Sequence, residues 1–125
     1  MKLLLDTNAF FWYVQDSTRL PAVWRDEISD LSNEVFFSAV SSWEISTKRT
    51  KGKLAFSGSP QKVATKNAFA MLPIQASHCE VAAELPDHHK DPFDRLLIAQ
   101  AQVEGLVIVT SDAIFKKYGV RTLRT

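Results

Sequence analysis

The alternation of short apolar runs with helical patterns is the feature that most constrains the fold of this chain. Apolar runs predict strands at residues 2–5, 35–37, 71–74 and 106–109, and residues 121–123 predict a final strand. Pro73 places the third of these at an edge or at a strand end. Strands separated by helices indicate a parallel sheet covered on both faces. The expected fold is therefore a single three-layer α/β/α domain over residues 1–125, with a mostly parallel central sheet.

The helices between these strands are expected from apolar spacing and from capping residues. They are expected around residues 10–13, over 21–31, from Ser41 or Ser42 to about Gly52, from 60 to about 70, from Ser77 to Leu85, and from Ser111 or Asp112 to about Gly119.

Residues 88–105 predict the best-defined helix of the chain. Asp91 suits the N-cap, Pro92 suits the first turn, and Gly105 suits the C-terminal stop. The apolar body of this helix is too broad for a surface helix, so we expect it to be buried on most sides. Asp94 falls on the same stripe as the buried residues. Its carboxylate therefore either forms a capping box with Asp91 or faces inward, where it needs a partner.

Four acids stand at strand ends or helix starts, where parallel α/β folds bind their ligands. They are Asp6, Glu44, Asp94 and Asp112. Each has a simpler interpretation: Asp6 and Asp112 as N-caps, and Glu44 in a capping box with Ser41 or in an ion pair with Lys48. Gathered at one edge, however, four carboxylates repel one another unless a cation neutralises them. Hard oxygen ligands favour Mg²⁺ or Mn²⁺, which can activate water for attack on a phosphodiester.

Four motifs, in this order, resemble the PIN-domain nucleases. They are Asp6-Thr7-Asn8 after an apolar strand, Ser41-Ser42-Trp43-Glu44-Ile45, the run HHKDPFDRLLIAQA at 88–101, and Thr110-Ser111-Asp112. Within that family the chain is most similar to the VapC-type toxins of bacterial and archaeal toxin-antitoxin pairs, over essentially its whole length.

The resemblance implies a compact α/β/α fold and Mg²⁺- or Mn²⁺-dependent endoribonuclease activity. It further implies dimerisation, as in many members, and inhibition by a cognate antitoxin protein. The family's acidic catalytic and metal-binding positions match Asp6, Glu44, Asp94 and Asp112, and the supporting polar positions match Asn8, Ser111 and Asp91.

Composition narrows the class of protein and its location. A chain of 125 residues is long enough for a core without disulfides, and a net charge of +1 gives no general polycation argument for nucleic-acid binding. The single Cys79 cannot form an internal disulfide, which fits a reducing cytoplasm. Asp6 and Asn8 interrupt the apolar start before it reaches the length of a signal peptide, and no apolar run approaches the ~20 residues that span a membrane. We therefore expect a cytoplasmic protein without membrane contact.

Basic side chains offer candidate RNA contacts. Lys48, Arg49 and Lys51 belong to the densest basic run, which either binds RNA phosphates beside the acidic site or forms a solvated helix end. Arg95 either contacts a phosphate or pairs with an acid.

Three further features can each be interpreted as structural or as functional. Adjacent His88 and His89 point apart, which favours a solvated loop over a transition-metal site. The aromatic residues 10–13 cannot all face the interior of one helix, so some are available for a dimer or antitoxin contact. Cys79 is expected to be a small buried residue rather than a nucleophile.

Two other classes of protein share parts of this pattern. A receiver domain needs an acceptor Asp at the end of a middle strand and a Lys after a late strand, where this chain has Ser38 and Thr110 or Ser111. A non-catalytic binding module is disfavoured because an uncompensated carboxylate cluster destabilises a fold by roughly 1 kcal/mol or more per unit of pKa shift. The sequence therefore favours a metal-dependent endoribonuclease.

Overall fold

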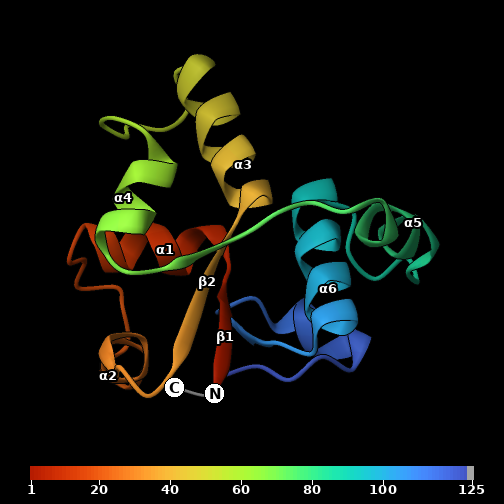
Figure 1. Ribbon diagram of the computed structural model, residues 1–125. Helices are drawn as coiled ribbons and strands as arrows, with labels where there is room; N and C mark the ends of the chain where they lie inside the picture. Colours follow the sequence, from red (N-terminus) through yellow and green to blue (C-terminus); the bar gives the residue numbers. More distant parts are fainter. Residues whose placement is uncertain (124–125) are drawn as a thin grey trace.

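A four-stranded, all-parallel sheet lies at the centre of the computed structural model, which describes residues 1–123 (Figure 1). In the order β3-β2-β1-β4, the strands are β3 (Ala70–Leu72), β2 (Glu34–Ser38), β1 (Lys2–Leu5) and β4 (Val107–Val109). Strand β3 is at the edge, as Pro73 predicts. Beyond β4, Thr122 makes a single parallel bridge to Ile108, so the strand expected at residues 121–123 is reduced to this bridge.

Helices cover both faces of the sheet, which confirms the predicted three-layer α/β/α fold (Figure 1). They are α1 (Thr7–Val14), α2 (Ala22–Ser29), α3 (Ala39–Thr50), α4 (Pro60–Lys66), α5 (Ala76–Glu84), α6 (Pro92–Glu104) and the 3₁₀ helix η1 (Ala113–Tyr118). A hydrophobic core lies on each face of the sheet, and successive side chains of β1 point into one or the other. Leu3 and Leu5 pack with residues of α1, α2 and α4, whereas Leu4 packs with residues of α6 and η1.

Helix α6 begins and ends where the sequence predicts. The Asp91 carboxylate accepts hydrogen bonds from the backbone N–H groups of Phe93 and Asp94, at 2.9 and 3.3 Å. Gly105 ends the helix with φ 68°, in the left-handed region that favours glycine. The start of α6 is thereby fixed, and with it the position of the Asp94 carboxylate.

A buried amide ties the middle of α6 to the sheet. Gln100 is fully buried, and its Oε1 accepts a hydrogen bond of 2.5 Å from the Ser38 hydroxyl at the end of β2. Its Nε2 donates to the Pro73 carbonyl just after β3, at 3.2 Å. These bonds satisfy polar groups that would otherwise be costly to bury, and they fix α6 against the carboxyl ends of two strands.

Two helices start at other residues than the sequence predicts. Ser38, not Ser41 or Ser42, caps α3, because its hydroxyl oxygen accepts from the Val40 N–H directly at the end of β2 and no loop intervenes. Gln75 and His78 form the capping box of α5, so Ser77 is not its cap. Helix α4 ends at Lys66 rather than near residue 70, where β3 has already begun.

The exposure of Cys79 contradicts one prediction, and the exposure of the aromatic side chains leaves another untested. Cys79 lies exposed on α5, so the prediction of burial is wrong. Among the aromatics, Phe10 is fully buried, residues 11–13 are half-buried, and Trp43 is the most exposed at 55%. Surface aromatic area is thus available, but its use in a dimer or antitoxin contact stays a prediction.

Within residues 1–123, none of the helices combines the length and the apolar character needed to cross a membrane.

Candidate active site

The seven side chains assigned to the acidic site from the sequence all line one small cavity at the carboxyl edge of the sheet. The cavity has a volume of about 150 Å³, and its lining consists of Asp6, Thr7, Asn8, Glu44, Lys48, Asp91, Asp94, Ser111 and Asp112. The topology explains this gathering, because β1, β2 and β4 are parallel and end at the same edge, where α6 also begins. Thr7 and Lys48 join the seven.

Asp6 follows β1 directly and is 6% exposed. Its Oδ1 accepts a hydrogen bond of 2.8 Å from the Ala9 N–H, so the simple interpretation as the N-cap of α1 is correct. The pKa of Asp6 is raised to about 6, mainly by burial; hydrogen bonds from Thr110 and Ala9 lower it, and the charges of Glu44 and Asp112 add to the rise. Capping and facing the cavity are compatible for this carboxylate.

Glu44 is 5% exposed and lies in the second turn of α3. Because Ser38 caps α3, the capping box expected with Ser41 is not formed. Instead, the Thr7 hydroxyl donates to Oε1 at 2.6 Å and the Lys48 ammonium donates to Oε2 at 2.5 Å. The ion pair with Lys48 is therefore confirmed, and Thr7, which sequence reasoning missed, fixes the other oxygen.

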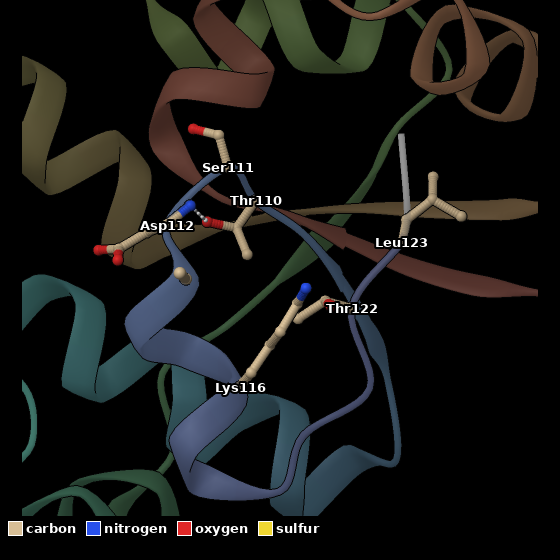
Figure 2. Close-up of a pocket in the computed structure, with 7 residues that line it drawn as sticks. Thr110, Ser111, Asp112, Lys116, Thr122 and Leu123 are labelled. Atoms are coloured by element: carbon tan, nitrogen blue, oxygen red, sulfur yellow. Dashed lines mark hydrogen bonds between the residues drawn. The ribbon is translucent and has the colours of Figure 1, made fainter.

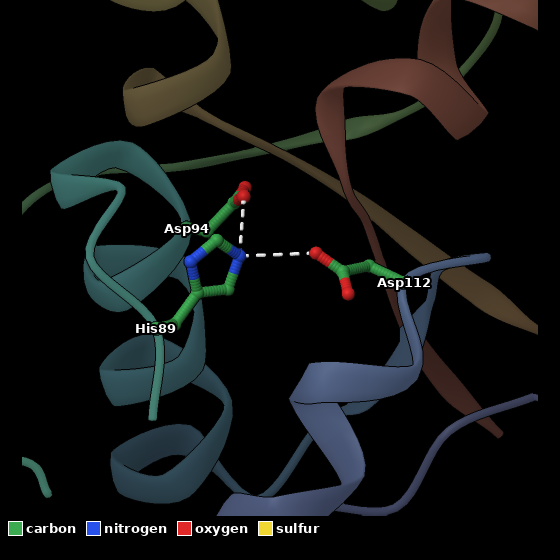
Figure 3. Close-up of side chains that lie close together, drawn as sticks. All are labelled: His89, Asp94 and Asp112. Carbon is green, nitrogen blue, oxygen red and sulfur yellow. Dashed lines mark hydrogen bonds and ion pairs between the residues drawn. The ribbon is translucent and has the colours of Figure 1, made fainter. Parts of the chain in front are cut away.

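Asp94 and Asp112 are joined by His89 (Figure 3). His89 Nε2 lies 2.9 Å from Asp94 Oδ2 and 3.0 Å from Asp112 Oδ2, and the His89 side chain is only 12% exposed. The expectation that both histidines lie in a solvated loop is therefore wrong for His89. The sequence offers one indication that His89 belongs to the site, which is its position two residues before Asp91.

The surroundings of Asp94 favour its neutral form. Desolvation raises the pKa of Asp94 to about 7, and the charges of Asp91, Glu44 and Asp6 also raise it, while His89 lowers it. The capping box expected with Asp91 is not formed, because the Asp91 N–H donates to His89 Nδ1 at 3.3 Å. Asp94 is thus the inward-facing acid that needs a partner.

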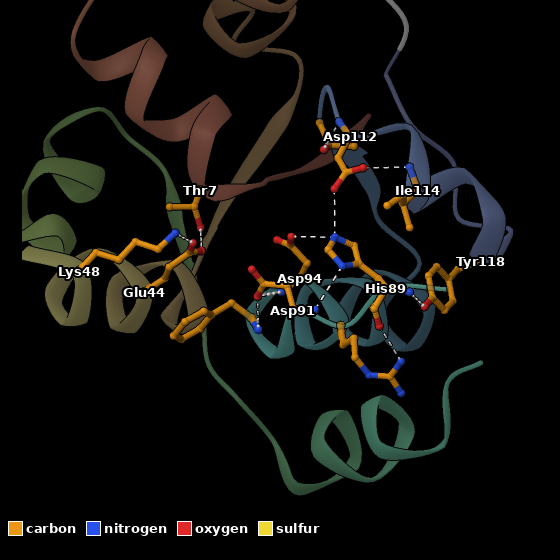
Figure 4. Close-up of polar contacts among 12 residues, drawn as sticks. Thr7, Glu44, Lys48, His89, Asp91, Asp94, Asp112, Ile114 and Tyr118 are labelled. Carbon is orange, nitrogen blue, oxygen red and sulfur yellow. Dashed lines mark hydrogen bonds and ion pairs between the residues drawn. The ribbon is translucent and has the colours of Figure 1, made fainter. Parts of the chain in front are cut away.

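Asp112 caps η1, as predicted, through a 2.9 Å hydrogen bond from the Ile114 N–H to Oδ1. Its other carboxylate oxygen faces His89. Figure 4 shows the resulting arrangement, with Glu44 and its partners Thr7 and Lys48 on one side of the cavity and His89, Asp94 and Asp112 on the other.

Two arginines named as RNA contacts from the sequence instead bind backbone carbonyls. Arg49 Nη1 donates to the carbonyls of Phe56, at 3.0 Å, and Gly58, at 2.5 Å. Arg95 donates to four carbonyls, those of Ala82, Leu85, Pro86 and His89. The ion pair with an acid is therefore wrong within residues 1–123, since the Arg95 guanidinium holds the segment between α5 and α6 in place, and a phosphate contact stays a prediction. Lys51 is exposed at the end of α3, and Lys48 is paired inside the cavity.

A second, larger cavity adjoins the acidic one (Figure 2). Its volume is about 490 Å³, and it is lined by Thr110, Ser111, Asp112, Ala113, Lys116, Thr122 and Leu123. Ser111 and Asp112 line both cavities, so the two meet across this pair of residues. In Figure 2 the Lys116 side chain extends toward Thr122, and the Asp112 carboxylate points away from it.

The sequence model of the PIN domain matches residues 3–121 of this chain. The chain belongs to the PIN domain family. The family resemblance seen in the four sequence motifs is therefore confirmed. No curated protein matches the chain in sequence.

Several solved structures share this fold. A chain of the DNA-bound VapBC complex from Salmonella typhimurium has a TM-score of 0.69 at 18% identity, covering 98% of this chain and 97% of that one. A chain of VapBC2 from Rickettsia felis, bound to a promoter DNA fragment, has a TM-score of 0.68 at 18% identity, covering 99% and 98%. FitAcB from Neisseria gonorrhoeae has a TM-score of 0.65 at 18% identity, covering 98% and 96%. At this identity the likeness concerns the fold.

Proposed function

We propose that this PIN domain protein is an Mg²⁺- or Mn²⁺-dependent endoribonuclease. The observation that carries the proposal is the convergence of Asp6, Glu44, Asp94 and Asp112, from four separate parts of the chain, on one cavity of about 150 Å³. Burial and the neighbouring acids raise the pKa values of Asp6 and Asp94, so ionised carboxylates in this cavity are stabilised by a bound positive charge. Lys48 offsets only part of the acidic charge, so the site is suited to a cation.

The donor set fits a hard divalent cation. Carboxylate oxygens are the ligands that Mg²⁺ and Mn²⁺ prefer, and Asp6, Asp94 and Asp112 offer them with Glu44 nearby. When bound, such an ion supplies the Lewis acidity that lets water attack a phosphodiester. Thr7 and Lys48 hold the Glu44 carboxylate in a fixed orientation, in which it can accept a proton from the attacking water. Asn8 and Ser111 line the same cavity and can orient that water.

The test is cleavage of a mixed RNA pool by the purified protein, first treated with a chelator and then supplied with Mg²⁺ or Mn²⁺. We expect internal cuts only after the metal is restored. Cutting that continues at full rate in the chelator, or no cutting with either metal, would refute the proposal.

Metal binding is expected to strengthen with pH. Protons compete with the cation for Asp6 and Asp94, whose pKa values are about 6 and about 7. Millimolar Mg²⁺ should therefore raise the melting temperature more at about pH 8 than at about pH 5, because it binds only the folded state with ionised ligands. Thermal unfolding with and without Mg²⁺ at both pH values measures this, and an equal shift at both would contradict it.

The RNA backbone is proposed to pass through the larger cavity. Lys116 lines this cavity together with Ser111 and Asp112 of the acidic site, and its ammonium can bind a phosphate of the RNA backbone. Lys116→Ala is made in a cleavage-inactive background. It should weaken RNA binding several-fold and reduce the slope of log binding constant against log salt concentration by about one. Lys117→Ala is the matched control, because the neighbouring Lys117 is also exposed but does not line the cavity. Equal losses in both variants would refute this path.

We further propose that the protein is the toxin of a type II toxin-antitoxin pair in the cytoplasm, inhibited by a cognate antitoxin and forming a homodimer. The likeness to chains of VapBC and FitAcB complexes over 98% or more of this chain supports this proposal. A small DNA-binding protein encoded immediately upstream, which stops the RNA cleavage when added, would be the antitoxin. An upstream protein without effect on cleavage would contradict the pairing.

The alternative of a receiver domain gains no support. Ser38, at the end of β2, is fully buried and bonded to Gln100, so the position of an acceptor acid is occupied by a structural hydroxyl.

A further inference from the structure

We propose that His89 is a positioning residue, which donates from Nε2 to Asp112, lies 2.9 Å from the Asp94 carboxylate and holds both carboxylates in place for a divalent cation, without binding the metal itself. The inference rests on the proposed metal site. It concerns the one side chain at this site that sequence reasoning placed in solvent.

His89 is fixed on several sides. Its backbone N–H donates to the Tyr118 hydroxyl at 2.6 Å, and that hydroxyl donates onward to the Pro86 carbonyl at 2.7 Å. Its own carbonyl accepts from Arg95 Nη1 at 3.1 Å. The ring stands edge-on to Phe115, with centroids 5.9 Å apart and planes at 77°. A side chain held in this way presents its Nε2 at one defined place (Figure 4).

The hydrogen-bond partner of His89 Nδ1 shows which ring nitrogen carries the hydrogen. The Asp91 N–H donates to His89 Nδ1 at 3.3 Å, so Nδ1 acts as an acceptor. In a neutral imidazole one nitrogen accepts and the other carries the hydrogen, which places the hydrogen on Nε2. Nε2 faces both carboxylates: Asp112 Oδ2 accepts its hydrogen bond at 3.0 Å, and Asp94 Oδ2 lies 2.9 Å away.

This assignment separates His89 from a metal ligand. A ligating histidine coordinates through an unprotonated nitrogen and donates its other N–H to an acceptor. If Nε2 bound the metal, Nδ1 would have to carry the hydrogen and donate it to an acceptor. The group beside Nδ1 is the Asp91 N–H, which is itself a donor, so Nδ1 has no such acceptor there. The three candidate ligand atoms of His89, Asp94 and Asp112 lie within 4.8 Å of one another, but only the two carboxylates are suited to the cation.

The consequence for binding is preorganisation. The Nε2–H bonds to Asp112 and lies beside Asp94, which offsets part of the repulsion between the two carboxylates and keeps an oxygen of each within about 3 Å of the same point. Removing a hydrogen-bond partner of metal ligands typically lowers metal affinity about 10- to 100-fold. Because no nitrogen ligand is lost, the loss should be equal for Mg²⁺ and Mn²⁺.

Calorimetric titration of Mg²⁺ and of Mn²⁺ into metal-free protein tests the inference. We expect His89→Ala to bind both ions about 10- to 100-fold more weakly than wild type, in an unchanged ratio. His89→Gln, which keeps an N–H at nearly the reach of Nε2, should recover part of the affinity, and the shorter His89→Asn should not. His88→Ala is the matched control, since His88 is exposed and packs edge-on against Tyr118, with centroids 5.1 Å apart.

The outcomes are distinguishable. A wild type that binds neither ion refutes the proposed metal site, and this inference with it. A wild type that binds, together with an His89→Ala variant that binds as tightly or more tightly, overturns the role of His89 alone. A variant that loses Mn²⁺ far more than Mg²⁺ would make His89 a ligand and also overturn the inference. If His89→Ala does not fold, the comparison of Gln with Asn decides.

Discussion

Asp94→Asn is expected to lower the rate of RNA cleavage by more than about 100-fold, because loss of a direct ligand should exceed the effect of losing a hydrogen-bond partner of ligands. The substitution keeps the size of the side chain and an oxygen that can lie beside His89 Nε2. It removes the charge that the proposed cation requires. Initial cleavage rates at saturating Mg²⁺, measured beside thermal unfolding, separate this loss from a loss of folded protein.

The matched control for that variant is Asp87→Asn, because Asp87 is an exposed acid a few residues before α6 and does not line the acidic cavity. Asp87→Asn should cut RNA at the wild-type rate. If Asp94→Asn also cut at that rate, Asp94 would be no more than a first-turn acid of α6.

Asp6→Asn is expected to stabilise the metal-free protein while abolishing its response to Mg²⁺. Asp6 is buried, and its pKa rises from 3.8 in the unfolded chain to about 6 in the folded protein. The folded state therefore holds this proton longer, and stability present below about pH 4 is lost as the pH rises through about 6. The shift corresponds to a loss on the order of 3 kcal/mol at about pH 8, which asparagine avoids.

Asparagine can also replace the structural role of Asp6, because its side-chain oxygen can accept from the Ala9 N–H. Denaturant unfolding at about pH 4 and about pH 8 measures the effect: the variant should match wild type at the lower pH and exceed it at the higher. Asp26→Asn, at an exposed position of α2, controls for a general change in charge. A variant of Asp6 that is less stable than wild type at about pH 8 would show that its charge stabilises the metal-free fold.

The fold and the acids of the site could be predicted because they depend on local signals. Apolar runs such as residues 2–5 require a buried strand, and Asp91, Pro92 and Gly105 define the ends of α6. A parallel sheet then brings its carboxyl ends to one edge, so acids at strand ends meet without further information. Asp6 and Asp112 are caps and cavity residues at once, which made the two interpretations of each compatible rather than competing.

The partners of those acids could not be predicted, because they depend on how distant segments meet. His89 reaches Asp112 across 23 positions of sequence, and Thr7 reaches Glu44 across 37. Arg95 shows the same limit: its neighbour Asp94 suggested an acid or a phosphate as partner, whereas the loop after α5 surrounds it with carbonyls. The start of α3 at Ser38 was missed because the helix follows β2 without a loop.

The central claim is that the carboxylates of Asp6, Asp94 and Asp112 bind a divalent cation. Crystals of the wild-type protein soaked in Mn²⁺, at a pH above the raised pKa values of Asp6 and Asp94, test it most directly through anomalous scattering. An anomalous peak between these carboxylates, absent from Asp94→Asn crystals treated in the same way, is the predicted result. A cavity without a peak in wild-type crystals, or a peak that persists unchanged in Asp94→Asn, would contradict it.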